Sequence, residues 1–102
     1  METSTNIDST SAIAALSALA QEHRLAVYRL LVQAGEDGMA AGAIAEALGM
    51  PASSLSFHLG QLRLTGLIQQ ERRHRSLIYR AEYAAMNGLV AYLVENCCQG
   101  AR

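Results

Sequence analysis

Apolar residues recur at helical spacing over much of the chain, and polar or glycine-containing breaks divide them into segments. One helical series covers residues 13–19, and a second covers 25–32 after a polar break at Gln21-Glu22. This pattern predicts two consecutive helices within residues 11–34. The segment 35–38, Gly-Glu-Asp-Gly, is expected to end the second helix, because glycine supplies the backbone freedom that ends helices and begins turns.

The next two predicted helices are joined by a very short connection. Residues 40–48 form one helix and about 51–65 a longer one, with Gly49-Met50 between them. Pro51 suits the first position of a helix, because its missing N–H has no partner inside the helix. The longer helix has an apolar stripe with spacing i, i+4 and i+7, formed by Leu55, Leu59 and Leu62. The opposite face carries Ser53, Phe57, Gly60 and Gln61.

After Gly66 the helical spacing gives way to short segments with β-branched or aromatic residues. Residues 67–72 and 76–81, separated by Arg73-His74-Arg75, predict a two-stranded hairpin with a basic tip. Helical spacing then returns from residue 82 to about 98. The predicted fold is therefore mainly α with a small β-hairpin, a winged helix-turn-helix of about five helices and a two-stranded wing.

Length and composition fit one folded domain. The chain has 102 residues, of which 51% are hydrophobic, enough for a core without disulfides or a structural metal. Residues 1–10 are polar and are predicted to be a disordered tail, whereas residues 11–102 are predicted to form the folded domain. The chain has no run of about 18 apolar residues and no secretory signal, which predicts a cytoplasmic protein with no membrane partner.

Positive charge is concentrated in one part of the sequence. The formal net charge is -1, but five of the eight basic residues lie between residues 58 and 80, where Glu71 is the one acidic residue. These five residues are Arg63, Arg72, Arg73, Arg75 and Arg80. Guanidinium groups on a hairpin can neutralise phosphates or enter the minor groove, and the alternative is a solvated, charged hairpin.

Two runs of sequence resemble the ArsR/SmtB family of metal-responsive bacterial repressors. Residues 43–59, AIAEALGMPASSLSFHL, resemble its helix-turn-helix, and residues 62–68, LRLTGLI, resemble the exit from its recognition helix into the wing. The likeness covers about residues 12–98. It implies a homodimeric repressor that binds double-stranded DNA, in which the first and last helices pair. The two recognition helices would then enter major grooves about 34 Å apart on a palindromic operator.

A recognition helix presents short polar groups to base edges in the major groove. Phe57 is suited to a thymine methyl, and Gly60 would allow a close approach of the backbone. Two structural alternatives stay open, in which Ser53 caps the helix and Phe57 covers the core. The predicted DNA-binding residues are Ser53, Ser54, Ser56, Phe57, Gln61, Arg63, Arg72, Arg73 and Arg75.

The histidines give no sign of catalysis or of a zinc chelate. His58 falls beside the apolar stripe and is interpreted as a packed, hydrogen-bonded residue, while His23 and His74 are isolated. No pair of His or carboxylate residues has zinc-chelate spacing, and none accompanies a nucleophile. We therefore expect no enzymatic activity and no required cofactor.

Cys97 and Cys98 are the candidate inducer site. Thiolates select soft ions, so the expected ligands are trivalent arsenic as arsenite or methylated arsenite, antimonite or Cd(II). A methylated arsenical needs two sulfur bonds, whereas inorganic As(III) prefers a third, from the other subunit or a small thiol. The family resemblance points to members with cysteines near the C-terminus. The Cys-x-Cys pair that many arsenic-responsive members carry before the turn is replaced here by residues 40–43, Ala-Ala-Gly-Ala.

Other readings of these features remain open. A Cys97–Cys98 disulfide would give a redox-switched repressor, but neighbouring Cα atoms lie ~3.8 Å apart, short of the usual ~4.4 to 6.8 Å. The cysteines could instead be inert, because a helix C-terminus disfavours thiolate. In the inducer interpretation, the side chains of Cys97 and Cys98 on a regular helix would point about 100° apart. A ligand that bridges the two sulfurs would then unwind the last turn of that helix. A third class is a winged-helix module that binds protein, which the basic wing disfavours.

Overall fold

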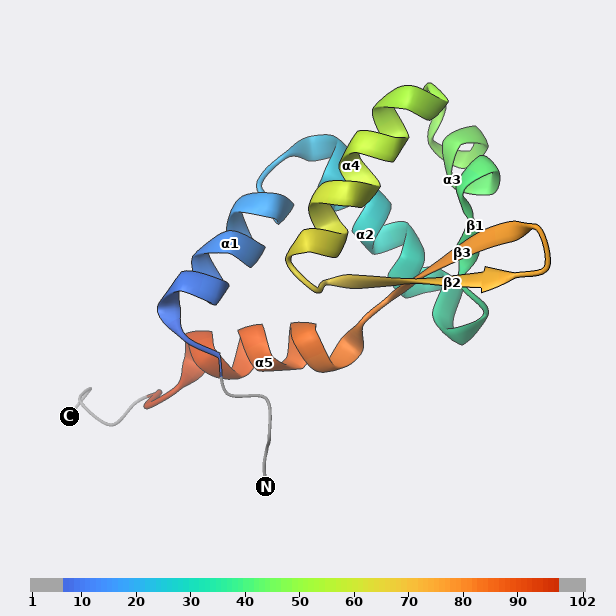
Figure 1. Ribbon diagram of the computed structural model, residues 1–102. Helices are drawn as coiled ribbons and strands as arrows, with labels where there is room; N and C mark the ends of the chain where they lie inside the picture. The colour runs from blue at the N-terminus through green and yellow to red at the C-terminus, as the bar shows by residue number, and fades with distance from the viewer. Residues whose placement is uncertain (1–6, 98–102) are drawn as a thin grey trace.

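The computed structural model describes residues 7–97 and has the predicted order of helices and hairpin (Figure 1). Its elements are α1 (Ser9–Leu19), α2 (Glu22–Ala34), the short 3-10 helix η1 (Gly35–Asp37), β1 (Met39–Ala40), α3 (Ala41–Leu48), α4 (Ala52–Leu64), β2 (Ile68–Arg73), β3 (Ser76–Ala81) and α5 (Tyr83–Val94). In Figure 1, α1 and α5 lie at one end and the β2–β3 hairpin projects at the other. The winged helix-turn-helix prediction is confirmed.

The sheet has one strand more than predicted. Strand β1 pairs antiparallel with β3, so the strand order is β1-β3-β2. Its two residues, Met39 and Ala40, lie opposite Tyr79 and Ile78. A strand of two residues is too short to produce an alternating pattern, which is why the sequence predicted a hairpin only.

The first helix begins before the predicted boundary at Ser11. Ser9 is its first residue, and the Asp8 carboxylate caps it by accepting a 2.8 Å hydrogen bond from the backbone N–H of Ser11. Asp8 is one of the residues that suit an N-cap, because its short side chain reaches an N–H left without a helical partner. Residues 8–10 of the predicted tail therefore belong to the folded domain, and residues 1–6 lie outside the described part.

The last helix is shorter than the sequence predicted. It ends at Val94 instead of about residue 98, and Glu95, with φ -53° and ψ 134°, is no longer helical. Asn96 has a φ of 63°, in the left-handed region that asparagine enters more readily than most residues. Cys97 lies in the turn after α5, and Cys98 lies outside the described residues. Placing Cys97 on the last helical turn was therefore wrong, and the separation of side chains on a regular helix does not apply to it.

A single hydrophobic core joins all five helices to the sheet. All three leucines of the predicted stripe on α4 are buried. The buried residues of α1 are alanines, whose small side chains allow a close approach to neighbouring helices. The largest fully buried side chains are Val27, Leu31, Ile44, Leu55, Leu62 and Leu67. This core fixes which faces of α4 and of the wing point outward.

Gly38 makes the turn into β1 and should be intolerant of any side chain. Its φ of 66° and ψ of -165° belong to a region that is essentially restricted to glycine. A Cβ would lie 2.5 Å from the Tyr79 carbonyl oxygen, whereas a Cβ on Gly35, at φ 71° and ψ -151°, would meet nothing within 4 Å. We expect Gly35→Ala to cost about 1–3 kcal/mol and Gly38→Ala clearly more, because it adds a backbone clash to the strain. Thermal unfolding followed by circular dichroism measures both, and equal losses would contradict the close approach to β3.

Candidate DNA-binding interface

The outer face of α4 carries the residues predicted to read bases. Ser53, Ser54, Ser56 and Phe57 are exposed and Gln61 is half-buried. The N-cap position is Pro51, and no side chain makes a capping hydrogen bond there. Phe57 is 60% exposed. Both structural alternatives are thereby excluded, since Ser53 does not cap the helix and Phe57 does not cover the core.

A tight turn sets the angle between α3 and α4. Gly49 ends α3 in the left-handed conformation, with φ 62° and ψ 38°. The backbone N–H of Met50 donates to the Ala45 carbonyl at 3.0 Å, and Pro51 leads directly into α4. Glycine suits this position because it has no Cβ to oppose a positive φ. The turn holds α4 against the core with its polar face outward.

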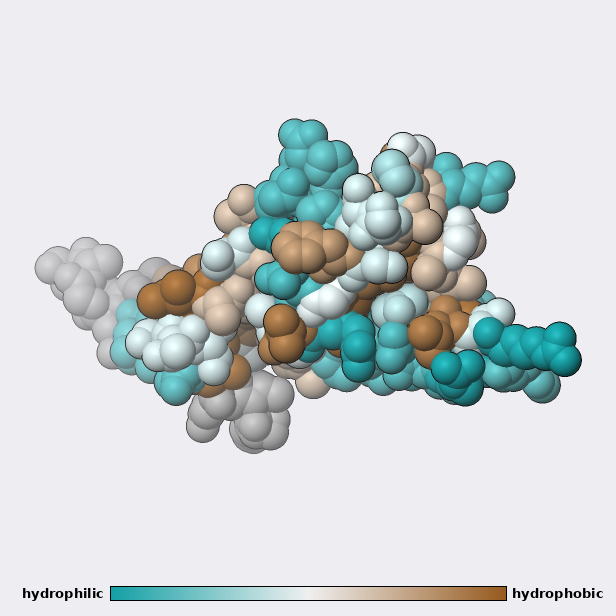
Figure 2. Space-filling view, turned by 45° about the horizontal axis from the view of Figure 1, so that its top comes forward, coloured by the Kyte–Doolittle hydropathy of each residue, from teal (hydrophilic) through white to brown (hydrophobic). Residues whose placement is uncertain are grey.

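The wing is a two-stranded antiparallel hairpin with its basic residues near the tip. Arg73 lies opposite Ser76 and is followed by His74, whose φ is 59°, and Arg75. Arg72, Arg73 and Arg75 are exposed. Figure 2 shows strongly hydrophilic side chains at the end of the molecule formed by the hairpin. The predicted phosphate-binding residues of the wing are thus accessible.

The wing arginines differ in how far they are engaged within the protein. Arg73 and Arg80 both donate to Oε1 of Glu71, and Arg80 also donates to Gln69 Oε1 at 3.1 Å. The hydrogen bonds from Arg80 and Arg73 lower the pKa of the Glu71 carboxyl. Within residues 7–97, Arg72 and Arg75 form no ion pair. Arg80 therefore braces the sheet, while Arg72 and Arg75 are available for phosphates.

His58 connects the recognition helix to the start of α2. Its Nδ1 lies 3.4 Å from Arg24 Nη1, and its ring stacks on His23 with centroids 5.6 Å apart. Arg24 is itself anchored, because its Nε donates to the Ala18 carbonyl at 2.7 Å. The interpretation of His58 as a packed, hydrogen-bonded residue is confirmed. The sequence did not predict Arg24 as a partner of His58, because nothing local indicates a contact between residues 34 positions apart.

Known proteins are similar to this chain in sequence and in fold. A family model described as a helix-turn-helix domain matches residues 19–71. The HTH-type transcriptional regulator YgaV of Escherichia coli K12 is 32% identical over 87 residues, which cover 85% of this chain and 86% of that protein. The ArsR-like transcriptional regulator from Rhodococcus sp. RHA1 superposes with a TM-score of 0.80 at 24% identity, covering 91% of this chain and 85% of that one.

A further solved structure is the homodimeric winged helix-turn-helix DNA-binding domain of Mb0332 from Mycobacterium bovis, a possible ArsR-family regulator. It matches with a TM-score of 0.68 and 28% identity, covering 91% of this chain and 85% of that one. The chain belongs to the ArsR family. It is a DNA-binding transcriptional regulator.

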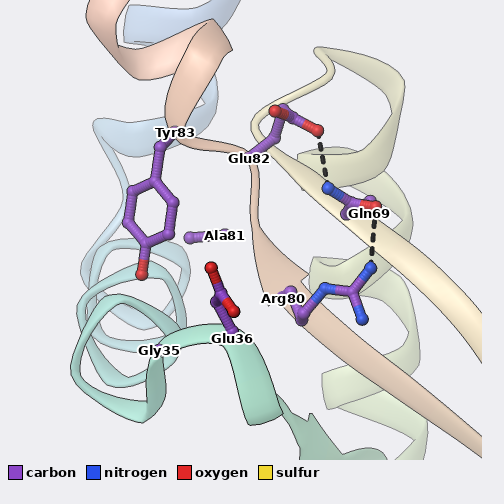
Figure 3. Close-up of a pocket in the computed structure, with 7 residues that line it drawn as sticks. All are labelled: Gly35, Glu36, Gln69, Arg80, Ala81, Glu82 and Tyr83. Atoms are coloured by element: carbon purple, nitrogen blue, oxygen red, sulfur yellow. Dashed lines mark hydrogen bonds between the residues drawn. The ribbon is translucent and has the colours of Figure 1, made fainter.

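A second feature of this ArsR-family chain is a polar pocket where the wing meets α5 (Figure 3). It has a volume of about 350 Å³ and is lined by Gly35, Glu36, Gln69, Arg80, Ala81, Glu82 and Tyr83. Gln69 Nε2 donates to Glu82 Oε1 at 2.6 Å, and the Tyr83 hydroxyl donates to the Val32 carbonyl at 3.2 Å. These bonds tie the first residues of α5 to β2 and α2.

The described part of the chain holds neither a metal cluster nor a membrane span. Within residues 7–97 no group of three or more His, Cys, Asp or Glu side chains is placed to hold a metal ion. The described helices include none that is long and apolar enough to cross a membrane. Of the predicted inducer residues, Cys97 is exposed and Cys98 lies outside this range.

Arg75 and Arg80 offer a matched test of the wing. We expect Arg75→Ala to weaken binding to operator and random DNA alike and to reduce the slope of log affinity against log salt by about 0.9, because one phosphate contact is lost. Arg80→Ala should leave that slope unchanged and lower thermal stability, because its side chain bonds Glu71 and Gln69. Fluorescence anisotropy at several salt concentrations measures both. A slope that responds to Arg80 and not to Arg75 would reverse the assignment.

The environment of His58 predicts a pH dependence of stability. Partial burial, with Arg24 and His23 nearby, lowers the pKa of His58 below its ordinary value of 6.5. The folded protein therefore binds this proton less tightly than the unfolded chain, so stability falls as the pH drops below about 6.5 and is level above it. His58→Asn, which retains an acceptor for Arg24, should flatten the profile between pH 5 and 7. The control is His74→Asn on the exposed wing tip, and unfolding temperature against pH is the measurement.

Proposed function

We propose that this protein is a homodimeric transcriptional repressor that binds a palindromic operator and is released by a thiophilic inducer at Cys97 and Cys98. One observation carries the DNA-binding part of the proposal. The exposed serines and Gln61 of α4 lie in the same domain as a wing whose Arg72 and Arg75 form no ion pair within residues 7–97. This combination supplies base-reading groups and phosphate-binding groups together.

The dimer is supported by an exposed apolar surface on α1 and α5, which lie side by side in Figure 1. Its large residues are each between 41% and 65% exposed, and they are Ile13, Leu16, Val90, Leu93 and Val94. Figure 2 shows apolar surface at this end of the molecule. A second copy related by a two-fold axis would cover this surface and present two α4 helices to successive major grooves. The similar Mycobacterium bovis domain is homodimeric.

The inducer site is inferred from the chemistry of two adjacent thiols. Soft sulfur donors favour trivalent arsenic, antimony or Cd(II) over hard cations. Cys97 lies in the turn three residues after the end of α5, the helix that contributes to the proposed dimer surface and whose N-cap residue, Glu82, is bonded to Gln69 of the wing. A ligand that holds the residues after α5 in a new arrangement would therefore act on both the dimer and the wing.

Single serine variants test the switch. Cys97→Ser and Cys98→Ser should each retain operator affinity and the sedimentation of a dimer, but should no longer be released by trivalent arsenicals. For the unmodified protein we expect a 5- to 150-fold loss of affinity on inducer binding, the usual range of allosteric coupling. Anisotropy titrations with As(III), methylated As(III), Cd(II), Zn(II) and peroxide give the measurement. Methylated As(III) should act at least as well as arsenite, because two thiols complete its coordination.

The outcomes separate the alternatives. Release of the double serine variant by arsenicals would place the inducer site elsewhere, and a strong preference for inorganic arsenite would require a third ligand. Release by peroxide and not by arsenicals would favour the redox-switched repressor. If no duplex is enriched from a random library, the chain would be a protein-binding winged helix and the proposed function would fail.

A further inference from the structure

The outer face of α4 carries two exposed apolar residues, one in the middle of the helix and one at its C-terminal end. Phe57 is 60% exposed and Leu64 is 81% exposed. A spacing of seven residues places them on the same side of the helix, two turns and about 10.5 Å apart. Gly60 lies between them on that side. Figure 2 shows apolar side chains surrounded by hydrophilic ones on the outer surface of the domain.

These residues border a shallow groove. Its volume is about 420 Å³, and its lining consists of Ser56, Phe57, Gly60, Gln61, Arg63 and Leu64. We call it the α4 groove. Its apolar centre is bordered by a hydroxyl, an amide and a guanidinium group. An occupant must therefore present an apolar group within an otherwise polar and negatively charged surface.

Gly60 has no structural role that explains its presence in a helix. A Cβ at this position would meet nothing within 4 Å, and its φ does not require glycine. Glycine inside a helix costs roughly 0.5–1 kcal/mol relative to alanine. The missing side chain deepens the α4 groove between Phe57 and Leu64, and so favours close approach of a ligand to the helix backbone.

Phe57 has an aromatic contact within the protein. Its ring packs edge-on against His58, with centroids 5.6 Å apart and an interplanar angle of 64°. His58 is in turn stacked on His23 and bonded to Arg24. A contact that restricts an exposed aromatic ring reduces the conformational freedom it loses on binding. This support distinguishes Phe57 from an apolar residue that is exposed by chance.

We propose that the α4 groove binds the 5-methyl group of thymine, so that each operator half-site carries a thymine against Phe57. This inference rests on the proposed function, in which α4 reads bases in the major groove. Among the four bases, thymine alone presents an apolar group in that groove, and aromatic side chains contact it. The arginines of the wing and Arg63 supply the positive charge that a polyanion requires. Phe57 and Leu64 thereby determine specificity, while the serines and Gln61 bind polar base edges.

Deoxyuridine lacks only the 5-methyl group of thymine and so isolates this contact. An operator is first selected from a random duplex library, and each thymine of its half-sites is then replaced by deoxyuridine. We expect at least one symmetric position at which the replacement weakens binding about fourfold per half-site, the equivalent of one buried methyl. Replacement in both half-sites should multiply the two effects. Anisotropy at fixed salt concentration gives the dissociation constants.

Protein variants show whether the methyl meets the α4 groove. Phe57→Ala should bind the thymine and deoxyuridine operators equally. Gly60→Ala should weaken binding to the thymine operator while raising the unfolding temperature, a combination that misfolding does not produce. Val32→Ala, an exposed apolar residue on α2, is the matched control and should retain the full difference between the two operators.

Two results would overturn the assignment of the α4 groove to thymine methyl groups. If the unmodified protein binds every deoxyuridine operator as tightly as the thymine operator, or if Phe57→Ala retains the difference, the α4 groove does not bind thymine methyls. DNA binding by α4 would stand in both cases. Failure to enrich any duplex would instead count against the proposed function, so the two failures are distinguishable.

Discussion

The candidate DNA-binding interface depends on the burial of three leucines on one side of α4. Leu55, Leu59 and Leu62 are at most 3% exposed. Burying each such side chain is worth about 1.5–3 kcal/mol, so turning the helix to expose all three would cost as much as the stability of a typical domain. The opposite side must therefore face outward, whatever residues it carries. Phe57 and Leu64 are exposed because the leucines already occupy the core.

Much of this arrangement was predictable because its signals are local. Helical spacing, the Gly49-Met50-Pro51 turn and the basic hairpin each lie within a few consecutive residues. The missed features depend on contacts across the fold. Pairing of β1 with β3 requires Gly38 to lie against the backbone of Tyr79. The contact between Arg24 and His58 joins α2 to α4. The end of α5 was predicted too far along the chain for a different reason. The residue that marks it is Asn96, whose positive φ cannot be seen in the sequence.

The number of arginines in the sequence does not show which of them are bonded within the protein, because this depends on the strand register. Arg80 lies opposite Gln69, two residues before Glu71 on the same strand, so its guanidinium reaches carboxylate and amide together. Arg75 lies at the tip, beyond the last pair of the ladder. The four arginines of the wing therefore divide into two that bond to Glu71, Arg73 and Arg80, and two that form no ion pair within residues 7–97, Arg72 and Arg75.

The proposed switch requires α5 to act over a distance. Its 12 residues span about 18 Å, from the Gln69–Glu82 bond at its start to the turn that holds Cys97. A packed helix of this length moves as a body and does not deform gradually, so a change after its C-terminus would be felt at its N-terminal attachment to the wing. In a dimer paired through α1 and α5, that same motion would alter the spacing of the two α4 helices. One helix would then connect the inducer, the partner subunit and the DNA, with Glu82 as its point of attachment.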